Sequence, residues 1–117
     1  MNSALAKAAD AAREFTVTVG VTLRLRLPTR LHLQRIVARS GTDIAAAQED
    51  ILLASVVGWS GINAAAIVPD TDGELAFDPE LILHVIDAYP SAADAAFLQL
   101  IERHAKRREQ AEAAAGN

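Results

Sequence analysis

The stretch that decides the fold is FTVTVGVTLRLRL, residues 15–27, in which apolar and polar side chains alternate strictly. Every odd-numbered position carries Phe, Val or Leu, and every even-numbered position carries Thr, Gly or Arg. A period of two residues is typical of a β-strand with one buried face. The stretch is long for one strand, so Gly20 indicates a bulge or a break into two strands. Pro28 ends the segment.

Helical patterns lie on both sides of this segment. Residues 3–14 predict a short alanine-rich helix that Ser3 can cap. Residues 29–39 are ambiguous, because their apolar positions suit a helical stripe while the first of them would also continue the alternation. We favour a helix there, since Ser40 and Gly41 are typical of a helix end.

A longer helix follows. Thr42 or Asp43 can cap it, and it runs to about Val57. Its apolar residues cover more than one stripe, which predicts a central, largely buried helix. They are Ile44, Ala47, Ile51, Leu52, Ala54 and Val56. A loop over residues 62–76 contains the turn sequence PDTDG.

The C-terminal part predicts two more helices. Asp78, Pro79 and Glu80 supply the cap, the first-position proline and the first-turn acid of a helix start. That helix ends before residue 90, and Ser91-x-x-Asp94 resembles a capping box that begins the last helix. The apolar stripe of the last helix is Phe97, Leu100, Ile101 and His104.

The composition favours one mainly α domain. A chain of 117 residues is long enough for one core and short for two ordinary domains. Its alanine-rich, aromatic-poor composition favours closely packed helices. We therefore expect a small helical domain of about four helices with an N-terminal β-strand or hairpin at about residues 15–27. An N-terminal helix and β segment would span residues 1–28, a helical core 29–108, and a frayed tail 109–117.

Charge is segregated along the chain. Residues 1–42 carry seven basic and two acidic groups, residues 43–102 carry eleven acidic and no basic groups, and residues 103–117 carry four basic and two acidic groups. Such blocks favour docking of the basic part on the acidic part, or head-to-tail contact between copies of a homo-oligomer. The acidic block argues against nucleic acid as the main partner, because it would repel phosphate.

Several function classes find no support in the sequence. The absence of cysteine excludes a disulfide framework, thiolate catalysis and cysteine-ligated metals. No apolar run reaches the roughly 18 residues needed to cross a bilayer, and the charged N-terminal segment is unlike a secretory signal. We expect a cytoplasmic protein without a membrane partner.

No catalytic or cofactor constellation is evident either. The three histidines lack the H-E-x-x-H spacing of a zinc site, and no serine lies in G-x-S-x-G. Glu80, His84 and Asp87 share one helical face, an arrangement more typical of solvated charge than of a metal site. Residues 70–74, DTDGE, place glycine at the fourth position instead of the sixth of an EF-hand loop, which favours a surface turn. We expect no enzymatic activity, no cofactor and no metal.

Two segments are candidates for protein contacts. Leu23, Arg24, Leu25, Arg26 and Leu27 alternate apolar and basic side chains. One interpretation is a half-buried strand with arginines toward solvent. The other is an edge strand that pairs with a second copy.

The second segment is VVGWSGI, which places Trp59, the only tryptophan, between two glycines. With Ile62 and Phe77 it could form an anchor patch for a partner. The alternative is that the ring closes the core by packing against Ile86 or Phe97.

The order of these features resembles the small tail assembly chaperones of long-tailed bacteriophages and prophages. In that family an aliphatic helix runs into V-x-x-W-x-G-I/L, and an acidic loop leads to Phe, a helix cap and two closing helices. Here the sharpest matches are VVGWSGI at residues 56–62 and FDPE at residues 77–80. The likeness covers roughly residues 16–108, and the N-terminal helix and long alternation depart from it.

The resemblance implies a non-enzymatic role in the host cytoplasm. Such proteins bind the tape measure protein, keep it soluble and help the tail tube protein assemble around it. They self-associate, often have a longer frameshifted product, and are absent from the mature virion. A structural head–tail connector or tail completion protein of the virion is the alternative, and a DNA-binding regulator using residues 24–39 is a weaker one.

Overall fold

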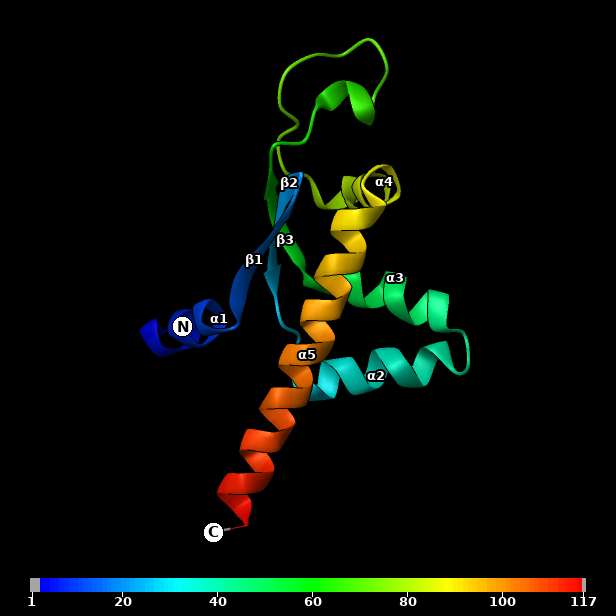
Figure 1. Ribbon diagram of the computed structural model, residues 1–117. Helices are drawn as coiled ribbons and strands as arrows, with labels where there is room; N and C mark the ends of the chain where they lie inside the picture. Colours follow the sequence, from blue (N-terminus) through cyan, green and yellow to red (C-terminus); the bar gives the residue numbers. More distant parts are fainter. Residues whose placement is uncertain (1–2, 117) are drawn as a thin grey trace.

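The computed structural model describes residues 3–116. These form five α-helices and one three-stranded antiparallel sheet (Figure 1). The helices are α1 (Ala4–Ala12), α2 (Arg30–Ser40), α3 (Ile44–Ser55), α4 (Ile82–Ala88) and α5 (Pro90–Ala115). The strands are β1 (Glu14–Val19), β2 (Val21–Arg26) and β3 (Val56–Ser60), and short 3-10 turns lie at Ala64–Ala66 and Pro79–Leu81. The mainly helical class with an N-terminal hairpin is confirmed, but the number of helices is higher than expected and the sheet has a third strand.

The opening stretch folds into the hairpin β1–β2, as its alternation predicts. The chain reverses at Gly20, whose φ of 75° is a conformation that glycine adopts without a steric penalty. The register pairs Phe15 with Leu25 and Val17 with Leu23, so the apolar faces of both strands point the same way. That shared face lies on the core, where Leu23 and Leu25 are buried.

The expectation of a helix to about Val57 followed by a loop is wrong, because strand β3 follows α3 directly. Helix α3 ends at Ser55, and the next five residues pair antiparallel with β2. Val56 and Val57 are β-branched and Gly58 is a poor helix former, so this segment is better suited to a ladder than to another helical turn. The prediction failed because the partner strand lies more than thirty residues earlier in the chain.

Two α-helix starts follow the predicted caps, and a third has a cap that was not predicted. The Ser3 hydroxyl accepts a hydrogen bond from the Ala6 amide at 2.9 Å, and the Asp43 carboxylate accepts one from Ala46 at 3.0 Å. Thr29 caps α2, so the ambiguous residues 29–39 are helical.

The prediction of a capping box at Ser91 and Asp94 is wrong. Helix α5 begins at Pro90, which places Ser91 inside the first turn. Proline at this position is preorganised for a helix because its φ is fixed and its missing N–H would have no partner there. The tail predicted to extend or fray continues as exposed helix to Ala115.

The core lies between the apolar face of the sheet and helices α2 to α5. Helix α5 packs against β1 and β2 and runs diagonally past them (Figure 1). Its buried residues are Ala92, Ala93, Ala96 and Leu100, and the small alanines allow a close approach. Helix α3 is buried only at its C-terminal end, because Ile44 is 79% exposed. The expectation of a largely buried central helix is therefore wrong for its first turns.

Three parts project from this core. They are α1, the C-terminal turns of α5, and a loop over residues 61–74 that lies at the opposite end of the molecule from the C-terminus (Figure 1). The principal extents are 58 × 38 × 27 Å. Within the described chain no single helix is long and apolar enough to cross a membrane. The segments Pro79–Ala88 and Pro90–Ala115 reach the length and hydropathy of a membrane span only when taken together, and a bend of 110° separates them.

Candidate functional site

Trp59 lies on β3 opposite Leu23 and is half-buried. Its indole N–H donates a hydrogen bond to the Leu75 carbonyl at 3.0 Å. Its ring meets Phe77 in an edge-to-face arrangement, with centroids 4.6 Å apart and planes at 68°. Trp59 therefore fastens the end of the projecting loop to the sheet.

The three residues of the predicted anchor patch do not share one surface. Ile62 is fully buried, whereas Phe77 is 37% exposed. Trp59 and Phe77 line a shallow pocket of about 380 Å³ together with Arg24 and Gly58. The accessible part of the patch is therefore Trp59 and Phe77, and Ile62 supports them from the core.

The edge-strand interpretation of residues 23–27 is corrected by the sheet order. Strand β2 lies between β1 and β3, so both of its edges are occupied and cannot pair with another chain. The arginines on its polar face have partners. Arg26 pairs with Glu14 at 3.0 Å, and Arg24 donates to the Val57 carbonyl at 3.1 Å. This arrangement is the half-buried strand of the first interpretation.

Gly58 makes room for Arg24. A Cβ on Gly58 would stand 3.1 Å from Arg24 Nε and 3.2 Å from its Cζ, so the missing side chain lets the guanidinium lie across β3. Arg24 Nε also lies 3.7 Å from a Glu14 oxygen. The structure thus brings Arg24 beside Trp59, two candidates that the sequence placed in separate sites.

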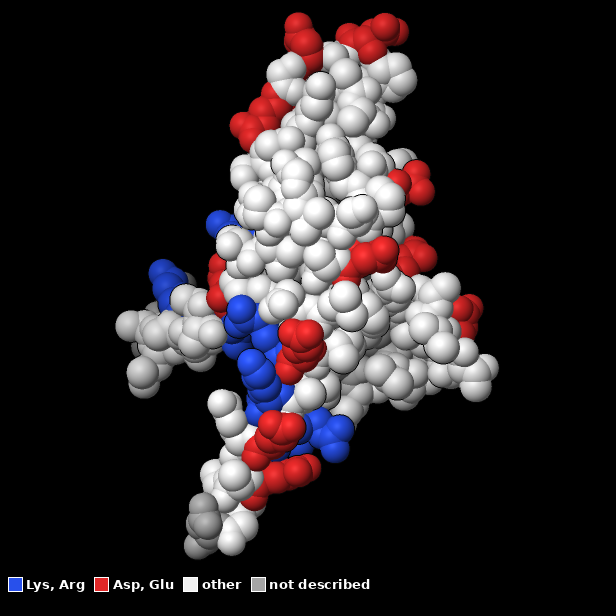
Figure 2. Space-filling view, in the orientation of Figure 1, with Lys and Arg blue, Asp and Glu red and all other residues white. Residues whose placement is uncertain are grey.

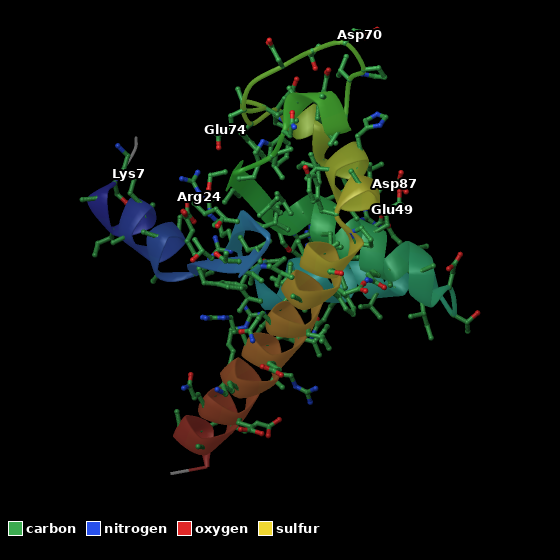
Figure 3. The ribbon with its side chains drawn as sticks, turned by 45° about the horizontal axis from the view of Figure 1, so that its top comes forward. Lys7, Arg24, Glu49, Asp70, Glu74 and Asp87 are labelled. Carbon is green, nitrogen blue, oxygen red and sulfur yellow. The ribbon has the colours of Figure 1, made fainter. Side chains whose placement is uncertain are left out.

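The loop over residues 61–74, which we call the tip loop, is closed by its own backbone. The Ala64 amide donates to the Gly73 carbonyl at 2.9 Å, and a β-bridge joins Asn63 to Glu74. Compact loops with paired ends of this kind are Ω-like. Asp70 lies at the outer end of the loop and Glu74 near its base (Figure 3).

An apolar groove that the sequence analysis did not predict lies between α2 and α5, with α3 beneath it. We call it the α2–α5 groove, and its volume is about 360 Å³. Leu33 and Ile51 form its buried floor, while Val37 and Ile101 are 51% and 41% exposed on its walls. The remaining lining residues are Gln34, Ala38 and His104. The helical stripes signalled several of these residues, but their exposure depends on how the two helices cross.

A second apolar recess of about 330 Å³ lies between α3 and α4. Leu52, Leu83 and Ile86 line it, and Glu49 and Asp87 stand at its rim. These two carboxylates lie close together in Figure 3. The recess is therefore apolar inside and acidic outside.

The basic part of the chain packs on the acidic part through α2 with α3 and through β1 and β2 with α5, but no ion pair of the described residues makes this contact. The ion pairs of residues 3–116 join Arg13 to Asp10, Arg24 and Arg26 to Glu14, and Arg108 to Glu112. None of these involves the acidic block of residues 43–102. Figure 2 shows acidic side chains at the tip-loop end and basic side chains gathered around the middle of α5. The segments that carry the two charge blocks pack against each other, but their charged side chains form no ion pair between the blocks within residues 3–116.

Arg107 and His104 form the most perturbed titratable pair. Arg107 donates to the Pro28 carbonyl at 2.7 Å and to His104 Nδ1 at 2.8 Å. Burial lowers the pKa of His104, and the positive charges of Arg107, Arg108 and Arg30 lower it further. Burial also lowers the pKa of Arg107. These effects favour the neutral imidazole, whose Nδ1 accepts the hydrogen bond from Arg107.

Across residues 3–116, no three His, Asp or Glu side chains are placed to hold a metal ion together. Glu80, His84 and Asp87 form no such group, and Glu80 lies in the 3-10 turn that precedes α4.

Comparison with protein-family models, with curated proteins and with solved structures gives no match to this chain.

Proposed function

We propose that this chain is a non-enzymatic protein-binding domain that serves as a tail assembly chaperone of a long-tailed bacteriophage or prophage. The observation that carries the proposal is the amount of large apolar surface that the described part of the chain leaves open. The exposed residues are Leu5, Val19, Leu31, Val37, Ile44, Leu53, Val68, Phe77, Leu83, Leu98 and Ile101.

Single exposed apolar residues are ordinary on protein surfaces. What supports binding here is that four of them border hollows. Phe77 lines the Trp59–Phe77 pocket, Leu83 lines the α3–α4 recess, and Val37 and Ile101 line the α2–α5 groove. Burying one such side chain stabilises a complex by about 1.5–3 kcal/mol at most. A few half-exposed anchors therefore support reversible binding, which a chaperone requires because it must release its partner.

The specific identity rests on the order of features along the chain. An aliphatic helix leads into VVGWSGI, an acidic loop follows, and FDPE opens the first of two closing helices. In this proposal Trp59 and Phe77 contact the tape measure protein. Trp59 has a second role, because it also holds the base of the tip loop.

The proposed partners are the tape measure protein and the tail tube protein. The chain would act in the bacterial cytoplasm, bind the apolar helices of the tape measure protein, and leave before the virion is complete.

Co-expression tests this function. The partner to be tested is the tape measure protein of the phage or prophage that encodes this chain, and an unrelated coiled-coil protein is the control. We expect a higher yield of soluble partner and a complex on gel filtration for the first protein only. No gain and no complex would contradict the proposal. Recovery of the chain from purified virions would instead favour the connector or completion protein.

A further inference from the structure

The tip loop has the shape and composition of a docking element. It lies at the far end of the molecule from the C-terminus (Figure 1), and two backbone hydrogen bonds of 2.9 and 2.8 Å close it. Val68 in this loop is 43% exposed. Asp70, at the outer end of the loop (Figure 3), and Asp72 follow it within four residues and are also exposed, so one short segment of a closed loop carries an exposed apolar side chain and two exposed acidic residues.

The α2–α5 groove has the complementary composition. Five of its seven lining residues are apolar, and the other two are Gln34 and His104. Arg30 lies one helical turn before Gln34 on α2, and Arg108 lies one turn after His104 on α5, so each extends the groove-facing side of its helix. The positive charges of both arginines lower the pKa of His104, a residue that lines the groove.

Within residues 3–116, the charges on both surfaces have no ion pair or only a weak one. Arg108 has only an exposed ion pair of 3.9 Å with Glu112, and Arg30 has no ion pair among the described residues. On the tip loop, neither Asp70 nor Asp72 pairs with a basic side chain of residues 3–116. One molecule thus carries two separate surfaces. One is the apolar α2–α5 groove with basic residues beside it, and the other is the tip loop, where exposed Val68 is followed by two acidic residues.

We propose that the tip loop of one copy docks into the α2–α5 groove of a second copy. Val68 would lie between Val37 and Ile101, with Asp70 and Asp72 facing Arg30 and Arg108. Because the two surfaces differ, the contact is heterologous and repeats head to tail into a ring or an open filament. It replaces the β2 edge pairing that the sheet order excludes.

This inference goes beyond the proposed function and does not depend on it. The contact is small, so the association is weak, charge-steered and sensitive to salt.

Charge exchange between the two surfaces tests the contact. The groove variant carries Arg30→Glu with Arg108→Glu. The tip variant carries Asp70→Asn with Asp72→Lys, and Asn is chosen because Asp70 has a φ of 65°, which Asn tolerates. In sedimentation at low salt, each variant alone should associate about tenfold more weakly than wild type. An equimolar mixture should recover most of the loss, because every groove then meets an oppositely charged tip.

A matched pair of variants tests the apolar part. Ile101→Glu lies in the groove and Leu83→Glu lies on α4 outside it, and both parent side chains are 41% exposed. We expect only Ile101→Glu to weaken association, and circular dichroism checks that both variants fold. Ile101→Ala is the milder second variant, and it should weaken association in the same direction.

Three outcomes would overturn the inference. They are a wild type that stays monomeric at every concentration, equal effects of Ile101→Glu and Leu83→Glu, and no recovery on mixing. A monomeric wild type that still solubilises the tape measure protein would remove this inference and leave the proposed function standing. If Ile101→Glu abolishes partner binding while wild type is monomeric, the partner protein occupies the groove instead.

Discussion

Replacing Trp59 by alanine should loosen the tip loop before it unfolds the sheet. The ring makes three separable contributions. Its N–H donates to the Leu75 carbonyl at 3.0 Å, its edge-to-face contact with Phe77 has a centroid distance of 4.6 Å, and its half-buried surface covers the core beside Leu23.

The free-energy cost of losing each contribution can be estimated. Losing the hydrogen bond costs about 1 kcal/mol, and losing the aromatic pair costs about 1 kcal/mol. Full truncation of a buried aromatic costs about 3–5 kcal/mol, and the half-burial of Trp59 places Trp59→Ala near the lower end. Trp59→Phe keeps a ring against Phe77 and should cost only about 1 kcal/mol.

Urea and thermal denaturation followed by circular dichroism measure these costs. For a chain of this size each kcal/mol lowers Tm by about 4 °C. Hydrogen exchange locates the effect, because the amides of Ala64 and Leu75 close the tip loop and should exchange faster in Trp59→Ala. The reasoning would be refuted if Trp59→Ala unfolded within about 0.5 kcal/mol of wild type, or if these two amides exchanged at the wild-type rate.

Three further perturbations test other parts of the structure. Gly20→Ala should lower the unfolding free energy by about 1 kcal/mol, because a φ of 75° is strained for a residue with a Cβ. No further steric cost is expected, since that Cβ would meet nothing within 4 Å. A gain in stability would contradict this reasoning. The pKa of His104 is lowered from 6.5 by burial and by Arg107, Arg108 and Arg30, so the unfolded state binds more protons. Stability should therefore fall as pH drops below about 6.5, and His104→Gln should flatten that fall in urea titrations; parallel profiles would contradict it. Self-association should weaken as salt approaches about 1 M, where the screening length is roughly 3 Å, and salt-insensitive oligomers in sedimentation would oppose the charge mechanism.

The hairpin and most helix starts were predictable because their signals are local. The alternation of residues 15–27 requires only that one face be buried, and Gly20 marks the turn. The caps at Ser3 and Asp43 act within three residues of themselves. Strand β3 was not predictable in this way, because five residues ending a helix become a strand only when β2 is available to pair with them.

The candidate site was predictable only in part. Trp59 and Phe77 do lie together, but burial of Ile62 depends on how the loop returns to the sheet through the Leu75 amide, which donates to the Ile62 carbonyl at 2.8 Å. The α2–α5 groove required the crossing of helices far apart in sequence. Helical stripes show that Val37 and Ile101 are apolar, but not that their side chains remain half open.

The central claim is that this chain acts by binding another protein through its exposed apolar surface. Calorimetric titration of the proposed partner, the tape measure protein, with this chain, repeated over several temperatures, tests it most directly. We predict binding with a negative heat capacity change, the marker of apolar burial. Absence of binding, or binding whose enthalpy does not change with temperature, would contradict the claim.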